Sequence, residues 1–144
     1  MTDHRRLRVL ATLVSLSAFL VSLMLPAIHA GNIAIHGSQL LFMGWMGIVV
    51  SGVFAWMANP LYALAVLLFV FRQDRWAPGV ALAAFLIGVD SLRLDTWRVD
   101  EKPMPIDHFG AAFYVWEASM LILAVGAFVV ATMCEKARRN VASG

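Results

Sequence analysis

Two carboxylic acids, Asp90 and Glu117, stand in or beside strongly apolar segments of this 144-residue sequence. A carboxylate inside the hydrocarbon of a membrane is rare, faces the protein interior and commonly takes part in function. Asn59 interrupts another apolar run, and Arg93 follows Asp90 by one helical turn, a spacing that allows an ion pair. We therefore predict a polar site of Asn59, Asp90, Arg93 and Glu117 that binds a proton, a cation or a small polar headgroup.

The same acids have a structural alternative. Asp90 can lie at the membrane interface without a ligand. Glu117 can hydrogen-bond Tyr114, Trp116 or an amide of the polar stretch at residues 90–108, and so fix that stretch to the helix that follows it. The sequence leaves both interpretations open.

The candidate metal ligands in this sequence are His36, Asp107 and His108. Imidazole and carboxylate groups suit zinc or copper, but the spacing matches no recognised ligand motif. The single cysteine, Cys134, excludes an internal disulfide, and no cysteine and histidine spacing resembles a zinc site. A haem between two helices would need histidines inside the apolar spans, which contain none. We predict no metal, no cofactor and no catalytic residues.

The composition predicts the surroundings in which these residues act. Hydrophobic residues make up 61 % of the chain, charged residues 14 %, and the mean hydropathy is +0.79. These values are far from those of soluble domains and indicate a multi-pass membrane protein, with residues 1–144 as one domain in a lipid bilayer. The net charge of +2 is too small to indicate nucleic-acid binding.

Four apolar segments are expected to cross the bilayer, which takes about 20 residues per helix. The first follows Arg5, Arg6 and Arg8, and its candidate cleavage site lacks a small residue at Ile28, so we predict an uncleaved signal anchor. The four segments span residues 9–25, 44–71, 77–89 and 109–133. Residues 26–39 and 90–108 are expected to be loops, the second irregular because of its prolines.

The run at residues 44–71 is the least regular of the four. Its 28 residues are many for one crossing and few for two. Pro60 removes a backbone donor and disfavours helix at Asn59, so we predict a helix break at Asn59-Pro60 that faces the bundle interior. Before the break, Gly44, Gly47 and Gly52 would let this segment pack closely against a neighbouring helix.

Charge placement favours four crossings over five. With four, the basic N-terminus, Arg72, Arg75 and the basic tail at residues 135–139 all lie on the cytoplasmic side, and the loops at residues 26–39 and 90–108 lie outside. Five crossings would put the basic tail outside and remain the alternative. We predict an all-α, polytopic membrane helical bundle in which Asn59, Asp90 and Glu117 share one depth.

Residues 44–62 and 99–120 carry a family resemblance. They contain GW-M-G, then G-V-F-A-W-M-A-N-P-L-Y, and D-E-K, then P-I-D-H-F-G-A-A-F-Y-V-W-E-A-S-M. This pattern resembles a group of small, uncharacterised bacterial inner-membrane proteins with about four crossings. The resemblance implies a bacterial inner membrane and brings no known activity. Glu117 stands where the group has a leucine-like residue, which shifts interest to Asn59, Asp100 and Glu101.

Three classes of function follow. The first is a small membrane protein that acts by interaction, as a subunit or accessory of a membrane complex or as a homo-oligomer. The second is an ion, proton or solute transporter that uses the Asn59 break and the embedded carboxylates. The third is a membrane-embedded enzyme that acts on lipid or quinone, with Asp100, Glu101 and His108 as candidates.

Overall fold

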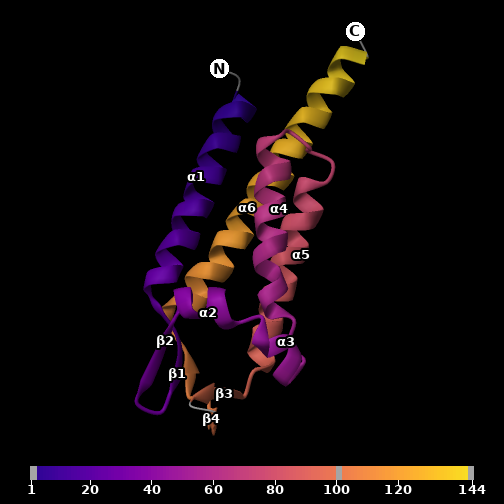
Figure 1. Cartoon of the computed structure of the whole chain (residues 1–144). Helices are drawn as coiled ribbons and strands as arrows, with labels where there is room; N and C mark the ends of the chain where they lie inside the picture. Colours follow the sequence, from indigo (N-terminus) through magenta and orange to yellow (C-terminus); the bar gives the residue numbers. More distant parts are fainter. Residues whose placement is uncertain (1–2, 100–101, 143–144) are drawn as a thin grey trace.

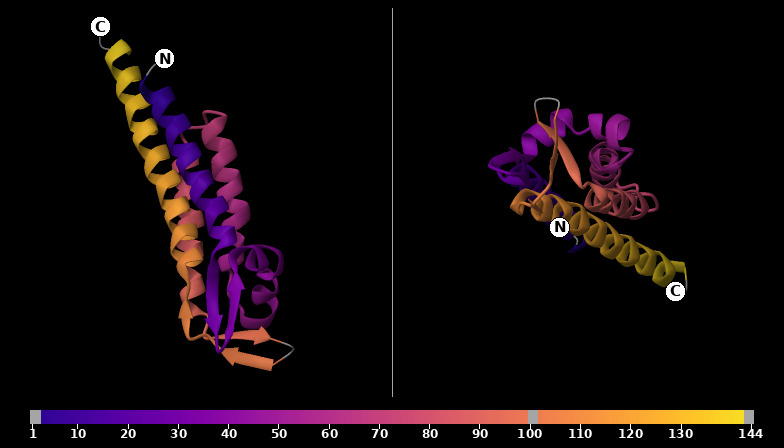
Figure 2. Two further views of the ribbon diagram at one scale, coloured as in Figure 1. Left: turned by 90° about the vertical axis from the view of Figure 1, so that its left-hand side faces the viewer. Right: turned by 90° about the horizontal axis from the view of Figure 1, so that it is seen from below.

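Four antiparallel helices form the body of the protein, for which a computed structural model describes residues 3–99 and 102–142 (Figure 1). They are α1 (Asp3–Met24), α4 (Ala58–Val70), α5 (Ala77–Val89) and α6 (Ala111–Ala142). Helix α1 packs on α6, α6 on α5, and α5 on α4, whereas α1 and α4 touch each other less. Both termini and the α4–α5 connection lie at one end of the bundle, and the strands lie at the other end (Figures 1 and 2).

Two helices of the described chain, α1 and α6, are long and apolar enough to cross a membrane. This test rests on length and composition, and the core helix of a soluble protein or an N-terminal signal sequence also passes it. Helices α4 and α5 have 13 residues each. Mostly helical structure is therefore confirmed, whereas two spans meet the criterion instead of the four expected.

The break in the second segment, residues 44–71, was predicted at the wrong place. The chain forms α2 (Gly37–Met43), α3 (Met46–Ser51) and the 3-10 turn η1 (Ala55–Met57) before α4 begins. Gly52 ends α3 with a φ of 65°, a conformation that glycine adopts without strain. Pro60 instead lies in the first turn of α4, where a backbone amide has no helical acceptor to lose.

The two segments expected to be loops contain short strands. Strand β1 (Pro26–Ala30) pairs with β2 (Ile33–His36) and with β5 (His108–Phe109), so that Ile28 lies opposite both Ile35 and Phe109. Strand β3 (Thr96–Val99) pairs with β4 (Lys102–Pro105). A two-stranded ribbon consists of edge strands, and these tolerate the prolines that had indicated irregular structure. The mostly helical structure is consistent with the all-α prediction, whereas the expectation of irregular loops at this end is wrong.

Small residues let the helices approach closely. A side chain on Gly126 of α6 would place its Cβ 2.6 Å from the Cβ of Ala11 on α1. The Ser15 hydroxyl on α1, fully buried, donates to the Ser119 carbonyl of α6 at 2.7 Å and lies 2.7 Å from the Tyr62 hydroxyl of α4. Close contact between small residues and hydrogen bonds between helices are typical of helix association in membranes.

Arg8 connects the start of α1 to the α4–α5 connection. Its guanidinium donates to the Phe69 carbonyl and lies over the Phe69 ring, 4.9 Å from the centroid. It also forms an ion pair with Asp74 at 2.8 Å. Asp74 Oδ1 accepts no hydrogen bond from the residues that the structure describes, so charge rather than bond geometry holds this pair. The Arg8 side chain is buried, whereas the sequence had indicated only a cytoplasmic charge.

Replacing Arg8 with alanine should destabilise the fold. The change leaves Asp74 without its partner in a largely buried place, which is expected to lower the free energy of unfolding by about 3 kcal/mol. Arg6→Ala removes the same charge from an exposed position of α1 and is the matched control. Chemical unfolding in detergent micelles, followed by circular dichroism, compares the two. Equal losses would mean that the Arg8 contacts contribute nothing.

Candidate functional site

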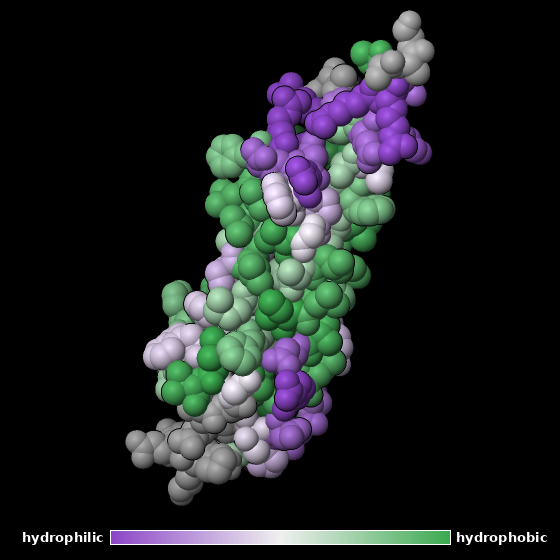
Figure 3. Space-filling view, turned by 90° about the vertical axis from the view of Figure 1, so that its right-hand side faces the viewer, coloured by the Kyte–Doolittle hydropathy of each residue, from purple (hydrophilic) through white to green (hydrophobic). Residues whose placement is uncertain are grey.

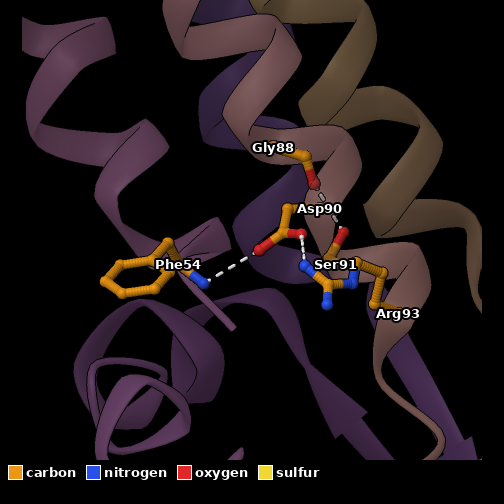
Figure 4. Close-up of polar contacts among 5 residues, drawn as sticks. All are labelled: Phe54, Gly88, Asp90, Ser91 and Arg93. Atoms are coloured by element: carbon orange, nitrogen blue, oxygen red, sulfur yellow. Dashed lines mark hydrogen bonds and ion pairs between the residues drawn. The ribbon is translucent and has the colours of Figure 1, made fainter. Parts of the chain in front are cut away.

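Asp90 joins the end of α5 to the broken segment before α4. It is the first residue of the 3-10 turn η2 (Asp90–Arg93), and its Oδ2 accepts the Phe54 N–H at 3.0 Å (Figure 4). Its Oδ1 lies 3.1 Å from the Arg93 guanidinium, so the predicted pair is confirmed. The Phe54 amide, followed by Arg93, lowers the pKa of Asp90 below its ordinary value. The carboxylate therefore holds a backbone amide that the break leaves without a helical partner.

Asn59 connects three elements through its side-chain amide. Its Oδ1 accepts the Trp116 indole N–H of α6 at 2.9 Å, and its Nδ2 donates to the Trp56 carbonyl of η1 at 3.2 Å. The Trp56 indole in turn donates to the Leu41 carbonyl of α2 at 2.8 Å. Asn59 therefore faces the bundle interior, as expected, although it does so from the first turn of α4 and not from a break.

Glu117 is buried against α5. Its exposed fraction is 8 %, and neither carboxylate oxygen has a hydrogen-bond partner among the described residues. A Cβ on Gly88 would lie 2.3 Å from Glu117 Oε1, so the glycine makes room for the carboxyl group. The contacts that the structural alternative proposed, with Tyr114, Trp116 or a loop amide, are not formed within that part of the chain. Burying an ionised carboxylate without a partner is strongly unfavourable, so this place suits a neutral carboxyl group.

The four predicted site residues lie at one end of the bundle but do not share one polar contact. Gly88 and Trp116 stand between them. Gly88 contacts Glu117, its carbonyl accepts the Ser91 hydroxyl at 2.7 Å, and a Cβ there would lie 3.2 Å from the Trp116 ring. The structure brings Asp90 and Arg93 together and leaves Asn59 and Glu117 in separate environments. Their role in binding stays a prediction.

The candidate metal ligands are separated. The His36 amide bonds the Gln39 side chain at the start of α2, and Asp107 accepts the Gly31 N–H at 2.7 Å. His108 stacks on His29 with 4.4 Å between ring centroids, a contact that pairing of β1 with β5 creates. No group of three or more metal-ligating side chains occurs among residues 3–99 and 102–142. Asp100 and Glu101 lie outside the described residues.

The three glycines predicted for close packing have different surroundings. A Cβ on Gly44 would lie 2.9 Å from the Trp56 ring, so Gly44 makes the expected close approach, here within the chain. A Cβ on Gly47 or on Gly52 would meet no atom of the described residues within 4 Å. Gly52 is exposed and is therefore open for a contact from outside the chain, whereas Gly47 borders a cavity inside the protein.

Sequence reasoning missed the residues that connect the site. The Phe54 amide and Gly88 carry no chemical signal in a sequence, because a backbone group and an absent side chain are recognised only when their partners are known. The two indoles, Trp56 and Trp116, form hydrogen bonds inside the bundle, and neither was among the predicted site residues. A tryptophan that must bury its N–H commonly finds such a partner.

Comparison with protein-family models, with curated proteins and with solved structures finds no match to this chain. The resemblance of residues 44–62 and 99–120 to small inner-membrane proteins stays a prediction.

The Asp90 contact should respond to pH. The pKa of Asp90 is lower in the folded protein than its ordinary value of 3.8. The contribution of Asp90 to the stability of the fold is therefore complete at pH values above 3.8 and is lost as the pH falls through the lower pKa of the folded state. We expect the Phe54 amide to lose protection from hydrogen exchange under acid. Asp90→Asn keeps an acceptor but does not titrate, so its Phe54 protection, compared at each pH, should stay constant. If Phe54 protection changes with pH in the same way in the wild type and in Asp90→Asn, titration of Asp90 does not control this contact.

The contact between Gly88 and Glu117 is open to a double-mutant test. Gly88→Ala forces a Cβ against the carboxyl group and should lower stability by about 1–3 kcal/mol. Gly79→Ala is the control, because it lies on the same helix and its Cβ would meet no atom of the described residues within 4 Å. Adding Glu117→Ala should reduce the cost of Gly88→Ala, which thermal unfolding in micelles would measure. If Gly88→Ala is as mild as Gly79→Ala, the carboxyl group does not occupy this space.

Proposed function

We propose that this chain is a small integral membrane protein of the bacterial inner membrane in which α1, α4, α5 and α6 all cross the bilayer. Large apolar side chains are exposed on each of these helices, among them Leu13, Leu67, Leu86 and Phe128. On the face seen in Figure 3, hydrophobic surface covers the middle of the bundle and hydrophilic residues gather at its two ends. An exposed apolar belt of this kind supports a membrane environment.

The short helices fit this proposal when their 3-10 extensions are included. Helices α4 and α5 would each be about 20 Å long at a rise of 1.5 Å per residue, against about 30 Å for the hydrocarbon core. The turn η1 precedes α4 and η2 follows α5, and both lead the chain toward the headgroups. Local thinning of the bilayer accommodates short spans at modest cost.

The basic residues support cytoplasmic termini. Three of them lie at the start of α1, two in the α4–α5 connection and three near the end of α6, which is eight of the chain's 11 lysines and arginines. All these segments are at the same end of the bundle (Figure 1). The positive-inside rule places that end in the cytoplasm and the strands outside.

We propose that the protein acts by interaction, as a subunit or accessory of a membrane complex or with a second copy of itself. The observation that carries this proposal is the α2–η1 surface, a set of large apolar side chains that are all exposed: Phe42, Met43, Trp45, Met46, Val49, Phe54 and Met57. Helices α2 and α3 are short and interrupted, and irregular backbone within the hydrocarbon requires cover by protein or water. A partner seated on this surface would provide that cover.

An open glycine adds to this argument. Gly52 belongs to the same segment, is exposed, and has no neighbour among the described residues that a Cβ would touch within 4 Å. Small residues of this kind allow the backbone of a second helix to approach closely. The exposed apolar residues of α1 and α6 lie on continuous helices, whose backbone needs no such cover.

One observation favours a second candidate, proton or ion transport. Glu117 is a buried acid without a partner in the described chain, as a proton-carrying group in a transporter would be. We prefer the interaction proposal because the whole α2–η1 surface supports it, whereas transport is supported by the single side chain of Glu117.

Truncating the α2–η1 surface should release the partner. Phe42→Ala removes a side chain that is 76 % exposed, and Phe128→Ala makes the same change at a 62 % exposed position on the lipid face of α6. Tagged wild type and variants would be isolated from native membranes in mild detergent, with mass spectrometry of the retained proteins. We expect Phe42→Ala to lower retention of a stoichiometric partner, or of an untagged second copy, at least about tenfold, and Phe128→Ala to leave it unchanged. Isolation of every variant alone and monomeric would overturn the proposal.

A further inference from the structure

A cavity of about 100 Å³ lies behind the α2–η1 surface, on the side that faces the bundle. Helix α2 covers it with Leu40 and Leu41, α6 contributes Phe113 and Trp116, and Gly47 and Val53 complete the side toward α3. The end of α1 and the start of β1 also contribute. The cavity is partly open, and α2 lies across the bundle between α1 and α4, the adjacent helices that touch each other least (Figure 1).

The lining presents hydrocarbon to an occupant. The indole donors of Trp56 and Trp116 are used by Leu41 and Asn59. The hydroxyl groups in the lining are used as well, since Ser22 donates to the Phe19 carbonyl and Ser91 to the Gly88 carbonyl. An ordered water needs two to four polar partners, and an apolar cavity of about 150 Å³ stays dry and binds benzene or xenon. The smaller cavity in this protein therefore suits a few methylene groups.

We propose that this cavity binds the end of one acyl chain of a phospholipid from the outer half of the bilayer. This inference rests on the proposed membrane placement and not on the proposed partner. In that placement the strands and η2 lie at the outer face, and the cavity lies just beneath them, at a depth that acyl chains occupy. On α1 and α4 the exposed residues Leu20 and Leu64 lie within about a turn and a half of the lining residues Leu23 and Asn59, and both are apolar, so a chain can enter from the side.

Tryptophan fluorescence can report the bound chain. A variant that keeps only Trp56 and Trp116, made with Trp45→Phe, Trp76→Phe and Trp97→Phe, would be purified and reconstituted into phosphatidylcholine vesicles. Part of the lipid would carry brominated acyl chains, which quench indole fluorescence on contact. A chain bound at one site gives a linear fall in fluorescence with the brominated fraction, whereas contact with many bulk chains gives a steeper curve.

Filling the cavity provides the decisive comparison. Gly47→Met, in the same background, should reduce the quenching about twofold or more, because the new side chain occupies the space of the acyl chain. The Cβ of this new side chain would meet no atom of the described residues within 4 Å. Gly79→Met is the control, since Gly79 is equally free of contacts and lies on α5 outside the cavity lining. Quenching that is the same in both variants, or a steep curve in the unsubstituted background, would overturn the proposal.

A reporter on the lipid face separates this result from the membrane placement. Leu121→Trp, in a background without other tryptophans, puts an indole at an exposed position of α6. If this indole is quenched while Trp56 and Trp116 are not, the cavity holds no acyl chain. If it is not quenched either, the membrane placement itself fails. The vesicles contain no other protein, so neither result depends on a partner.

Discussion

A chain of three hydrogen bonds holds the interrupted segment of this protein against its helical bundle. It runs from the Trp116 indole to Asn59, from Asn59 to the Trp56 carbonyl, and from the Trp56 indole to the Leu41 carbonyl. No residue of α2 is fully buried, so hydrophobic burial alone does not fix this helix in place. In an apolar environment an amide or indole N–H without a hydrogen-bond partner is strongly unfavourable. Breaking any one of the three bonds would leave such a group, so the three bonds stabilise one another. The position of α2, and with it the cavity beneath, follows from this chain.

The ends of the segment are fixed by two further contacts. At its start the Gly37 amide donates to the Leu25 carbonyl at 3.0 Å, and near its end the Phe54 amide donates to Asp90. Between these contacts the segment has two sides of different character. The α2–η1 surface faces outward and is apolar and uncovered, and the inner side closes the cavity. Any partner that presses on the outer side therefore acts on the same element that encloses the inner space, which would couple the two through one short stretch of backbone.

The parts of this fold that the sequence predicted are local. Helix α5 has the predicted bounds because an apolar run follows Pro78, which is tolerated in a first turn, and the pairing of Asp90 with Arg93 follows from their spacing alone. The error in placing the break has a local cause as well. Proline commonly ends a helix, so Pro60 was the stronger signal in this run, whereas Gly52 is one of several glycines. Strand β5 could not be foreseen, because it pairs with a segment about 80 residues earlier in the chain. The burial of Arg8 likewise depends on Phe69 and Asp74, which only the folded bundle brings near.

Glu117 illustrates how far the sequence can lead and where it stops. An acid within an apolar run is expected to face the protein interior, and it does so. What an acid does depends on its partners, and some of these come from distant parts of the chain, as Phe54 does for Asp90 and Gly88 for Glu117. Asp90 accepts a hydrogen bond from the Phe54 amide and pairs with the Arg93 guanidinium. Its carboxylate therefore connects the end of α5 to the segment before α4. Glu117 meets a glycine and the apolar surface of α5, so a neutral carboxyl group fits there by its shape. Two acids with the same signal in the sequence therefore have opposite surroundings, because Asp90 contacts a backbone amide and a cation whereas Glu117 lies where an ionised carboxylate would have no partner among the described residues.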